Sequence, residues 1–196
     1  MPIHQKIIAS LVIVLFASCN YPIVIKPTSE AAHEEEQTFK ADIIALGKGG
    51  YFLVARGYKF NDHVVTTATI SDYSHAVILD VTNDKIIEAT GEGVHPLPLD
   101  SFIHKSHKIT MVKPYGYTPE RAQNALQCCA AKYGKPYDYT GTVGLDNPDK
   151  YYCSELVVEC YQHLVDSLKI PKIITPKHVL EYGETVYVSP DRKVKK

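Results

Sequence analysis

The sequence lacks tryptophan and any strong excess of charge of one sign. Its 196 residues contain 21 Lys and Arg against 22 Asp and Glu, a formal net charge of −1 at pH 7. Nucleic-acid-binding proteins usually carry an excess of basic charge, so this balance gives no electrostatic argument for a nucleic-acid partner. The 14 tyrosines supply most of the aromatic surface, and their side chains can line a polar groove as well as pack in a core.

The apolar run near the N-terminus is too short to cross a membrane. It extends from Ile7 to Ala17, follows Lys6 and ends at Ser18-Cys19, whereas a spanning helix needs about 20 apolar residues. A basic residue followed by a short apolar run is typical of a secretory signal peptide. The ending "FASC" resembles the lipobox of bacterial lipoproteins, in which the cysteine after the cleavage site receives lipid, although Phe16 stands where leucine is usual.

We therefore expect residues 1–18 to be a lipoprotein signal peptide and Cys19 to be the lipidation site. Ordinary secretory cleavage near Ser18 is the alternative, and in both cases the mature protein is exported. With the lipid, it would be held at a membrane of the bacterial cell envelope, on the periplasmic or surface side.

The remaining chain suits one domain with attachments. Residues 19–40 include "KPTSEAAHEEEQT", which has little to bury, and we predict a flexible tether there. We expect the folded domain at residues 41–190 and a frayed basic tail at 191–196.

Cysteine is too scarce and too unfavourably spaced for a disulfide framework or a zinc site. Cys128 and Cys129 are neighbours on a predicted helix that begins at Thr118-Pro119. Cys153 and Cys160 lie about 10 Å apart along another helix, beyond the reach of a disulfide. The spacing of His163 from these two residues does not suit zinc either. We expect neither disulfides nor a metal.

The stretch "NPDKYYCSELVVECY", residues 147–161, predicts a helix with a cysteine at its start. Cys153, Val157, Cys160 and Leu164 recur at helical spacing on one face. Unpaired backbone N–H groups and the helix dipole favour a thiolate at this position, which is one way in which proteins activate a cysteine nucleophile. The alternative is a buried cysteine that packs as a small hydrophobic residue.

A cysteine nucleophile needs a base, and His75 is the best candidate among nine histidines. It opens "SHAVILDV", an apolar run that predicts a buried strand. "KIIEA" then predicts the returning strand of a hairpin. A four-residue loop, 81–84, would set Glu88 opposite Val77 and diagonal to His75, whereas a two-residue loop would set Glu92 opposite His75. Glu88 is thus the first choice for the residue that orients the imidazole, and Glu92 is the second.

Four motifs occur in the order "SHAVILD", "IIEATGEGV", "GKPYDYTG" and "YYCSELV". Together they resemble the YiiX/YebB-like branch of the NlpC-type papain-like cysteine hydrolases, over most of the chain from Ala41 to about Pro190. These enzymes have a circularly permuted papain fold, which lecithin retinol acyltransferase-like proteins share. One departure is at the start of the fold, where relatives usually read Gly-Asp before the first strand and this chain has Ala41-Asp42.

The resemblance implies that Cys153 is the nucleophile, His75 the general base and Glu88 the orienting residue. It also implies a substrate-binding surface near the thiol, for which we select Tyr139, Tyr152 and Ser154. The backbone N–H of Cys153 would be one donor to the oxyanion. This chemistry requires neither a metal nor an organic cofactor.

We expect an α+β fold in which an antiparallel sheet packs against helices, because strands and helices are segregated along the chain. The predicted strands lie near 42–46, 75–81, 85–89, 108–113 and 185–189, and the predicted helices near 118–133 and 153–166. The expected activity is cleavage of an amide bond, with cell-wall peptides as the substrate that the resemblance favours. A lipid acyl hydrolase or acyltransferase, and a binding module without turnover, are the alternatives.

Overall fold

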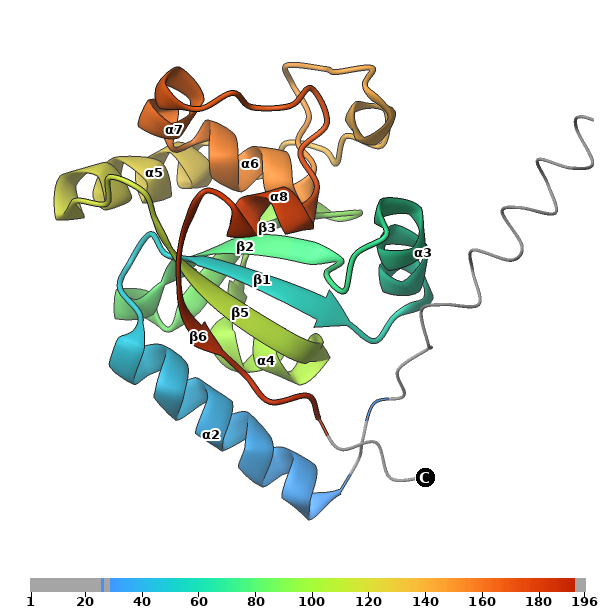
Figure 1. Ribbon diagram of the computed structural model, residues 1–196, viewed down its shortest axis with the longest axis vertical. Coiled ribbons are helices and arrows are strands. Elements are labelled where there is room, and N and C mark those ends of the chain that lie inside the picture. The colour runs from blue at the N-terminus through green and yellow to red at the C-terminus, as the bar shows by residue number, and fades with distance from the viewer. Residues whose placement is uncertain (1–25, 27–28, 193–196) are drawn as a thin grey trace, which may run out of the picture.

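The computed structural model describes residue 26 and residues 29–192 (Figure 1). The predicted signal peptide and Cys19 lie outside the described residues. Within the described part, no helix combines the length and the apolarity that crossing a membrane requires.

A six-stranded antiparallel sheet forms the centre of the domain, in the order β4-β3-β2-β1-β5-β6. The α+β prediction is confirmed. The strands are β1 (Phe52–Gly57), β2 (His75–Asp80), β3 (Lys85–Thr90), β4 (Gly93–Pro98), β5 (Ser106–Pro114) and β6 (Gly183–Val188).

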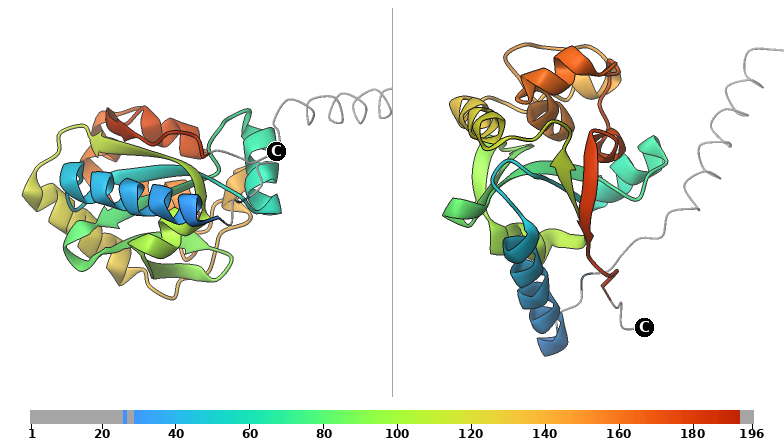
Figure 2. Two further views of the ribbon diagram at one scale, coloured as in Figure 1. Left: turned by 90° about the horizontal axis from the view of Figure 1, so that it is seen from below. Right: turned by 60° about the vertical axis from the view of Figure 1, so that its left-hand side comes forward.

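Helices cover both faces of this sheet, as the right-hand view of Figure 2 shows. One face packs against α5 (Pro119–Ala131), α6 (Cys153–Glu159), α7 (Gln162–Ser167) and α8 (Pro176–Leu180). The other face packs against α2 (Glu30–Leu46) and α4 (Leu99–Lys105). The shorter α3 (Phe60–Thr69) connects β1 to β2. Strand alternation divides the core accordingly: Phe52 and Val54 face the first layer, whereas Leu53 and Ala55 face the second.

The segment predicted as a strand at 42–46 is the end of helix α2, so that prediction is wrong. Ser29 caps this helix by accepting a hydrogen bond from the N–H of Ala32. Phe39 and Ile43 form a narrow apolar stripe against the second core, and the many glutamates on the remaining surface hide this stripe from a compositional reading. Residues 30–40, predicted to be tether, are therefore helical.

Strand β1 was not predicted, and it changes the alignment with the family pattern. The glycine before the first strand is Gly50, whose φ of +87° lies in the left-handed region. A Cβ at this position would lie 2.6 Å from that of Ala122, so only glycine fits. Ala41 lies within helix α2 and therefore does not stand at the turn before the first strand.

The helix predicted at 153–166 is interrupted after Glu159. The break turns the side chain of Tyr161 into the core, where its hydroxyl donates a hydrogen bond of 2.6 Å to the carbonyl of Gly50. Its ring packs edge-on against Phe52 with the centroids 5.2 Å apart. A buried tyrosine that finds both a partner for its hydroxyl and an aromatic neighbour compensates for the interrupted helix.

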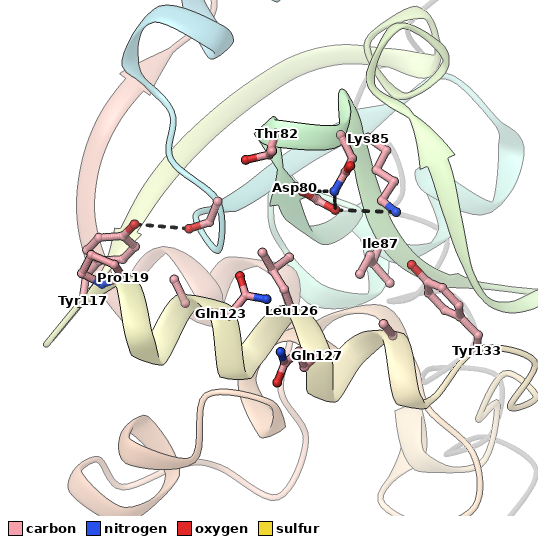
Figure 3. A pocket seen from close by; sticks show the side chains of 14 residues that line it. Asp80, Thr82, Lys85, Ile87, Tyr117, Pro119, Gln123, Leu126, Gln127 and Tyr133 are labelled. Atoms are coloured by element: carbon pink, nitrogen blue, oxygen red, sulfur yellow. Dashed lines mark hydrogen bonds and ion pairs between the residues drawn. The ribbon is translucent and has the colours of Figure 1, made fainter.

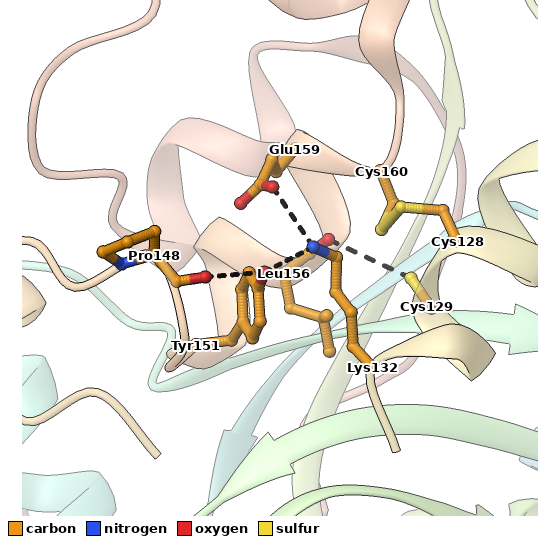
Figure 4. The surroundings of a disulfide bond; sticks show 8 residues. All are labelled: Cys128, Cys129, Lys132, Pro148, Tyr151, Leu156, Glu159 and Cys160. Carbon is orange, nitrogen blue, oxygen red and sulfur yellow. Dashed lines mark hydrogen bonds and ion pairs between the residues drawn. A yellow bond between two sulfur atoms is a disulfide. The ribbon is translucent and has the colours of Figure 1, made fainter. Parts of the chain in front are cut away.

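Cys128 and Cys160 form a disulfide, which corrects the expectation of none (Figure 4). Their Cα atoms lie 5.5 Å apart because α5 packs against α6. Helical spacing reports only on cysteines of the same helix, and these two cysteines meet through a contact between different helices. Lys132, the C-cap residue of α5, adds to the contact between the two helices. It donates to the hydroxyl of Tyr151 at 2.6 Å and to the carboxylate of Glu159 at 3.2 Å.

The start of the C-terminal segment predicted to be a frayed tail is anchored. Arg192 is buried, and its guanidinium donates to Glu36 of α2 at 2.8 Å and to the carbonyl of Ile103 at 2.7 Å. It also lies over the ring of Phe39, 5.3 Å from the centroid. The end of the described chain thus holds the first helix against α4.

Candidate active site

Cys153 is the first residue of helix α6, as the sequence predicted. Tyr152 occupies the N-cap, and Glu155 accepts a hydrogen bond of 3.2 Å from its backbone N–H. Cys153 exposes only 6% of its surface. The thiol is therefore enclosed at a helix start, where backbone donors favour a thiolate.

His75 and Glu88 are joined by a hydrogen bond of 2.6 Å between Nε2 and Oε2. The hairpin pairs Ile78 with Ile87 and Asp80 with Lys85, so residues 81–84 form the four-residue connection that this geometry required. Glu92 is exposed in the next turn, and the shorter hairpin that would have brought it to His75 does not occur. Glu88 is thus the carboxylate beside the imidazole.

Cys153 and His75 perturb each other's ionisation in the direction of an ion pair. Burial disfavours the thiolate, but the hydrogen bond and positive charge of His75, with a hydrogen bond from the N–H of Ala76, lower the pKa of Cys153. Burial would lower the pKa of His75, whereas the hydrogen bonds and charges of Cys153 and Glu88 raise it to about 10. The result favours thiolate and imidazolium together.

The ionisation of Glu88 completes this arrangement. Burial would raise its pKa, but the hydrogen bond and charge of His75, followed by the charges of His95 and Lys105, lower it. Glu88 is therefore a carboxylate that can accept the Nε2–H of His75, which leaves Nδ1 as the imidazole nitrogen for the thiol.

The thiol and the imidazole approach the sheet from different sides. Strand alternation places His75 and Glu88 on the face of Val77 and Ile86, whereas α6 covers the opposite face. Their contact is made where β2 begins, because His75 is the first residue of that strand and Cys153 the first of its helix. Each reacting group is thus held at the end of a rigid element.

The three residues selected for substrate binding have different surroundings. Tyr139 is 68% exposed, and its ring centroid lies 4.8 Å from that of Tyr137. It therefore lies at the exposed rim of the site. The hydroxyl of Tyr152 accepts a hydrogen bond of 2.9 Å from the N–H of Ile174, and Ser154 donates one of 2.8 Å to the Ile174 carbonyl. Tyr152 and Ser154 thus hold the Ile174 backbone against the start of α6, and Ser154 Oγ also lies 3.9 Å from the sulfur of Cys153.

Two neighbours of Cys153, His75 and Glu88 were not predicted from the sequence. Tyr137 has its pKa raised by burial and then by the negative charge of Cys153, so its neutral hydroxyl lies in the field of the thiolate. His95 stands opposite Glu88 in β4. The turn "TGEG" after Glu88 was the signal for this hairpin, and reading it would have paired the two residues.

Three carboxylates beside the site have ligand atoms within 4.8 Å of one another: Asp138, Asp146 and Glu155. Asp138 is fully buried and accepts hydrogen bonds from Thr140, Gly141 and Asn147, which lower its pKa against the effect of burial. Burial raises the pKa of Glu155 to about 8, with a hydrogen bond to Asp146 contributing. Carboxylate oxygens suit a hard cation such as Ca²⁺.

A separate groove of about 370 Å³ lies between α5 and the turn joining β2 to β3. Figure 3 shows Gln123 and Gln127 of α5 on one side, with Asp80 and Lys85 on the other. Cys153, His75 and Glu88 do not line it. It is thus distinct from the enclosed thiol.

Comparisons with known proteins show the family and the fold of the chain. The family described as "Permuted papain-like amidase enzyme, YaeF/YiiX, C92 family" matches residues 48–190. A solved structure described as "metalloprotein yiiX from Escherichia coli O157:H7" is 21% identical, with a TM-score of 0.58. The match covers 75% of this chain and 98% of that one, and it shows a shared fold. Curated proteins gave no significant match.

Proposed function

Because this chain belongs to the permuted papain-like amidases, a family of cysteine hydrolases, we propose that Cys153, His75 and Glu88 are its catalytic triad. The observation that carries the proposal is the His75–Glu88 hydrogen bond of 2.6 Å beside a thiol whose pKa the same imidazole lowers. A nucleophile, a base within reach and a third group that orients the base are the parts that covalent catalysis needs.

In the first half of the reaction, the Cys153 thiolate attacks the amide carbonyl carbon and forms a tetrahedral oxyanion. The backbone N–H of Cys153 donates to this oxyanion, and the neutral hydroxyl of Tyr137 is the neighbouring side-chain donor. His75 then transfers its proton to the leaving nitrogen, and the C–N bond breaks to give an acyl-enzyme and a free amine.

In the second half, His75 accepts a proton from water as the water oxygen attacks the thioester carbonyl. The C–S bond breaks, the carboxylic acid leaves and the thiolate–imidazolium pair returns. Glu88 holds the imidazole ring in one orientation throughout, because its carboxylate accepts from Nε2 in both halves.

For the substrate we propose cell-wall peptides, on the strength of the amidase description and the predicted export. A lipid acyl substrate is the second candidate because of the exposed apolar rim, in which Tyr139, Val143 and Leu145 are 68%, 70% and 68% exposed. A binding module without turnover is the third reading, and the ion-paired thiol argues against it.

The substrate assignment is tested by incubating wild type, Cys153→Ala and Cys129→Ala with muropeptides and acyl lipids, followed by mass spectrometry. Cys129 is also buried and free, so its variant controls for the loss of a buried thiol. We expect a muropeptide cut by wild type and Cys129→Ala but not by Cys153→Ala. A product that persists in Cys153→Ala would refute the nucleophile, and cleavage of lipids alone would favour the second candidate.

We further propose that the protein is exported and anchored by a lipid on Cys19. The Cys128–Cys160 disulfide supports export, because structural disulfides persist in oxidising compartments. Cys19→Ala should move the protein from the membrane fraction to the soluble fraction without altering its thermal unfolding. Retention of this variant at the membrane would rule out the anchor.

The description of yiiX as a metalloprotein leads us to propose a cation site at Asp138, Asp146 and Glu155. The residues fit a hard divalent cation, since the ligand atoms of three carboxylates lie within 4.8 Å of one another and burial raises the pKa of Glu155 to about 8. A bound Ca²⁺ would offset the negative charge of the cluster. Bound by these three carboxylates, the ion would link the 138–147 loop to the first turn of α6. It would take no part in the bond-breaking steps.

A further inference from the structure

His95 occupies the position directly opposite Glu88 in the β3–β4 pair. Its Nε2 lies 3.2 Å from Oε1 of Glu88, and its Nδ1 lies 3.0 Å from the carbonyl oxygen of Gly93. Glu88 is almost completely buried. The two oxygens of this carboxylate therefore face two different histidines, because Oε2 is bonded to His75.

The two ring nitrogens of His95 have different partners. A carbonyl oxygen can only accept, so the contact with Gly93 requires a hydrogen on Nδ1. The other nitrogen, Nε2, lies against Oε1 of Glu88 at ion-pair distance.

The backbone around His95 is fixed on both sides. Gly93 has a φ of +92°, and a Cβ there would come within 2.6 Å of the Lys135 carbonyl, so this turn requires glycine. Val94 donates to the same carbonyl at 2.9 Å, and its own carbonyl accepts from Gly134 at 2.9 Å. His95 is thus tied to the segment that leads into Tyr137.

We propose that His95 is a positioning residue of the triad, acting through Glu88. Because Nε2 of His95 lies 3.2 Å from Oε1, the ring limits the rotation of the carboxylate and keeps Oε2 at Nε2 of His75. Without His95, the carboxylate can turn about its terminal torsion, which is a soft torsion with a broad distribution. The inference rests on the proposed triad and adds a fourth residue that touches no reacting atom.

The test uses two substitutions that differ in hydrogen-bonding capacity. His95→Gln keeps an N–H donor on a side chain of similar reach, whereas His95→Leu keeps volume and removes the donor. The first readout is the downfield proton resonance of the His75–Glu88 hydrogen bond. The second is the rate at which iodoacetamide modifies Cys153 at pH 6.

We expect His95→Leu to lose the resonance and to slow the labelling by about tenfold, the lower end of the effect seen when partners that orient a reactive group are removed. His95→Gln should restore both. His104→Leu is the control. His104 lies on α4, away from the triad, and forms a hydrogen bond of 3.0 Å with Glu36 of α2. Thermal unfolding of each variant shows whether the fold persists.

An unchanged resonance in His95→Leu, or equal damage from Gln and Leu in folded variants, would overturn the positioning role. Failure of the triad itself has a different signature, because labelling of wild-type Cys153 would then be indifferent to His75→Ala. If His95→Leu does not fold, the comparison of His95→Gln with His95→Ala, which has neither the donor nor the volume, decides the same question.

Discussion

Cys129 and Cys153 are the two free thiols among the described residues, and their surroundings have opposite effects. Burial raises the pKa of Cys129 to about 12, whereas His75 lowers that of Cys153. Because the thiolate is the reactive form, iodoacetamide at pH 6 should label Cys153 well before Cys129 in unreduced protein. Peptide mass mapping measures the order, and equal labelling would contradict the ion pair.

The same labelling ranks the partners of Cys153. His75→Ala should slow the reaction most, because the thiolate loses its imidazolium. Glu88→Gln should slow it less, since the base remains, and Glu92→Gln should match wild type because Glu92 is exposed in the turn. A rate in His75→Ala equal to that of wild type would remove His75 from the mechanism.

The charge of His75 gives a pH prediction. Its folded pKa of about 10 lies above the unfolded value of about 6.5, so its charge stabilises the fold fully below pH 6.5. This contribution is lost as the pH rises through 10. An NMR titration should show a protonated His75 imidazole at pH 8, and Glu88→Gln should lower its midpoint. A midpoint near 6.5 in wild type would contradict the shift.

The sequence predicted Cys153 at the start of a helix and His75 on a buried strand, and the structure has both positions. Period two put Glu88 on the face of His75, but only the four-residue hairpin connection decides between Glu88 and Glu92. Tyr137 and His95 were missed because their roles depend on how a loop and a third strand fold against those elements. Helical periodicity likewise could not report Cys128 beside Cys160, which lie on different helices.

At the scale of elements, the disulfide braces helix α6, which begins with Cys153. It joins Cys128 of α5 to Cys160, the C-cap residue of α6. Cys128→Ala and Cys160→Ala should each lower the free energy of unfolding by about 3 kcal/mol. Urea titrations without reductant measure this, and dithiothreitol should abolish the difference from wild type. A wild type as unstable as the variants in the absence of reductant would mean that the bond does not form.

The carboxylate cluster predicts how pH and calcium act on the start of α6. Because burial raises the pKa of Glu155 to about 8 from an ordinary value of 4.5, the folded state holds more protons between these values, and stability falls as the pH rises through this range. Calcium should raise the melting temperature at pH 8 in wild type but not in Glu155→Gln. An equal rise in both proteins would exclude this site.

At the scale of the molecule, Arg192 and Glu36 join the end of the described chain to its first helix. Glu36 is only 14% exposed, so removing Arg192 leaves a largely buried carboxylate whose histidine neighbours are His104 at 3.0 Å and His33 at 4.0 Å. Arg192→Ala should therefore cost about 3 kcal/mol of unfolding free energy. Asp191→Ala is the control, because Asp191 is exposed in its pair with Lys108. Equal effects of the two substitutions would show that the buried pair is not the cause.

The contact between Arg192 and Glu36 of α2 also determines where the N-terminal part of such a protein can be replaced. The family resemblance begins at residue 48, yet the second core is closed by Phe39 and Ile43, which precede it. A leader grafted at residue 48 would remove α2 and open that core to water. A graft before Ser29 would keep the helix, its cap and the Arg192 contact. The segment that matches the family is therefore shorter than the segment that must be kept for the fold to remain intact.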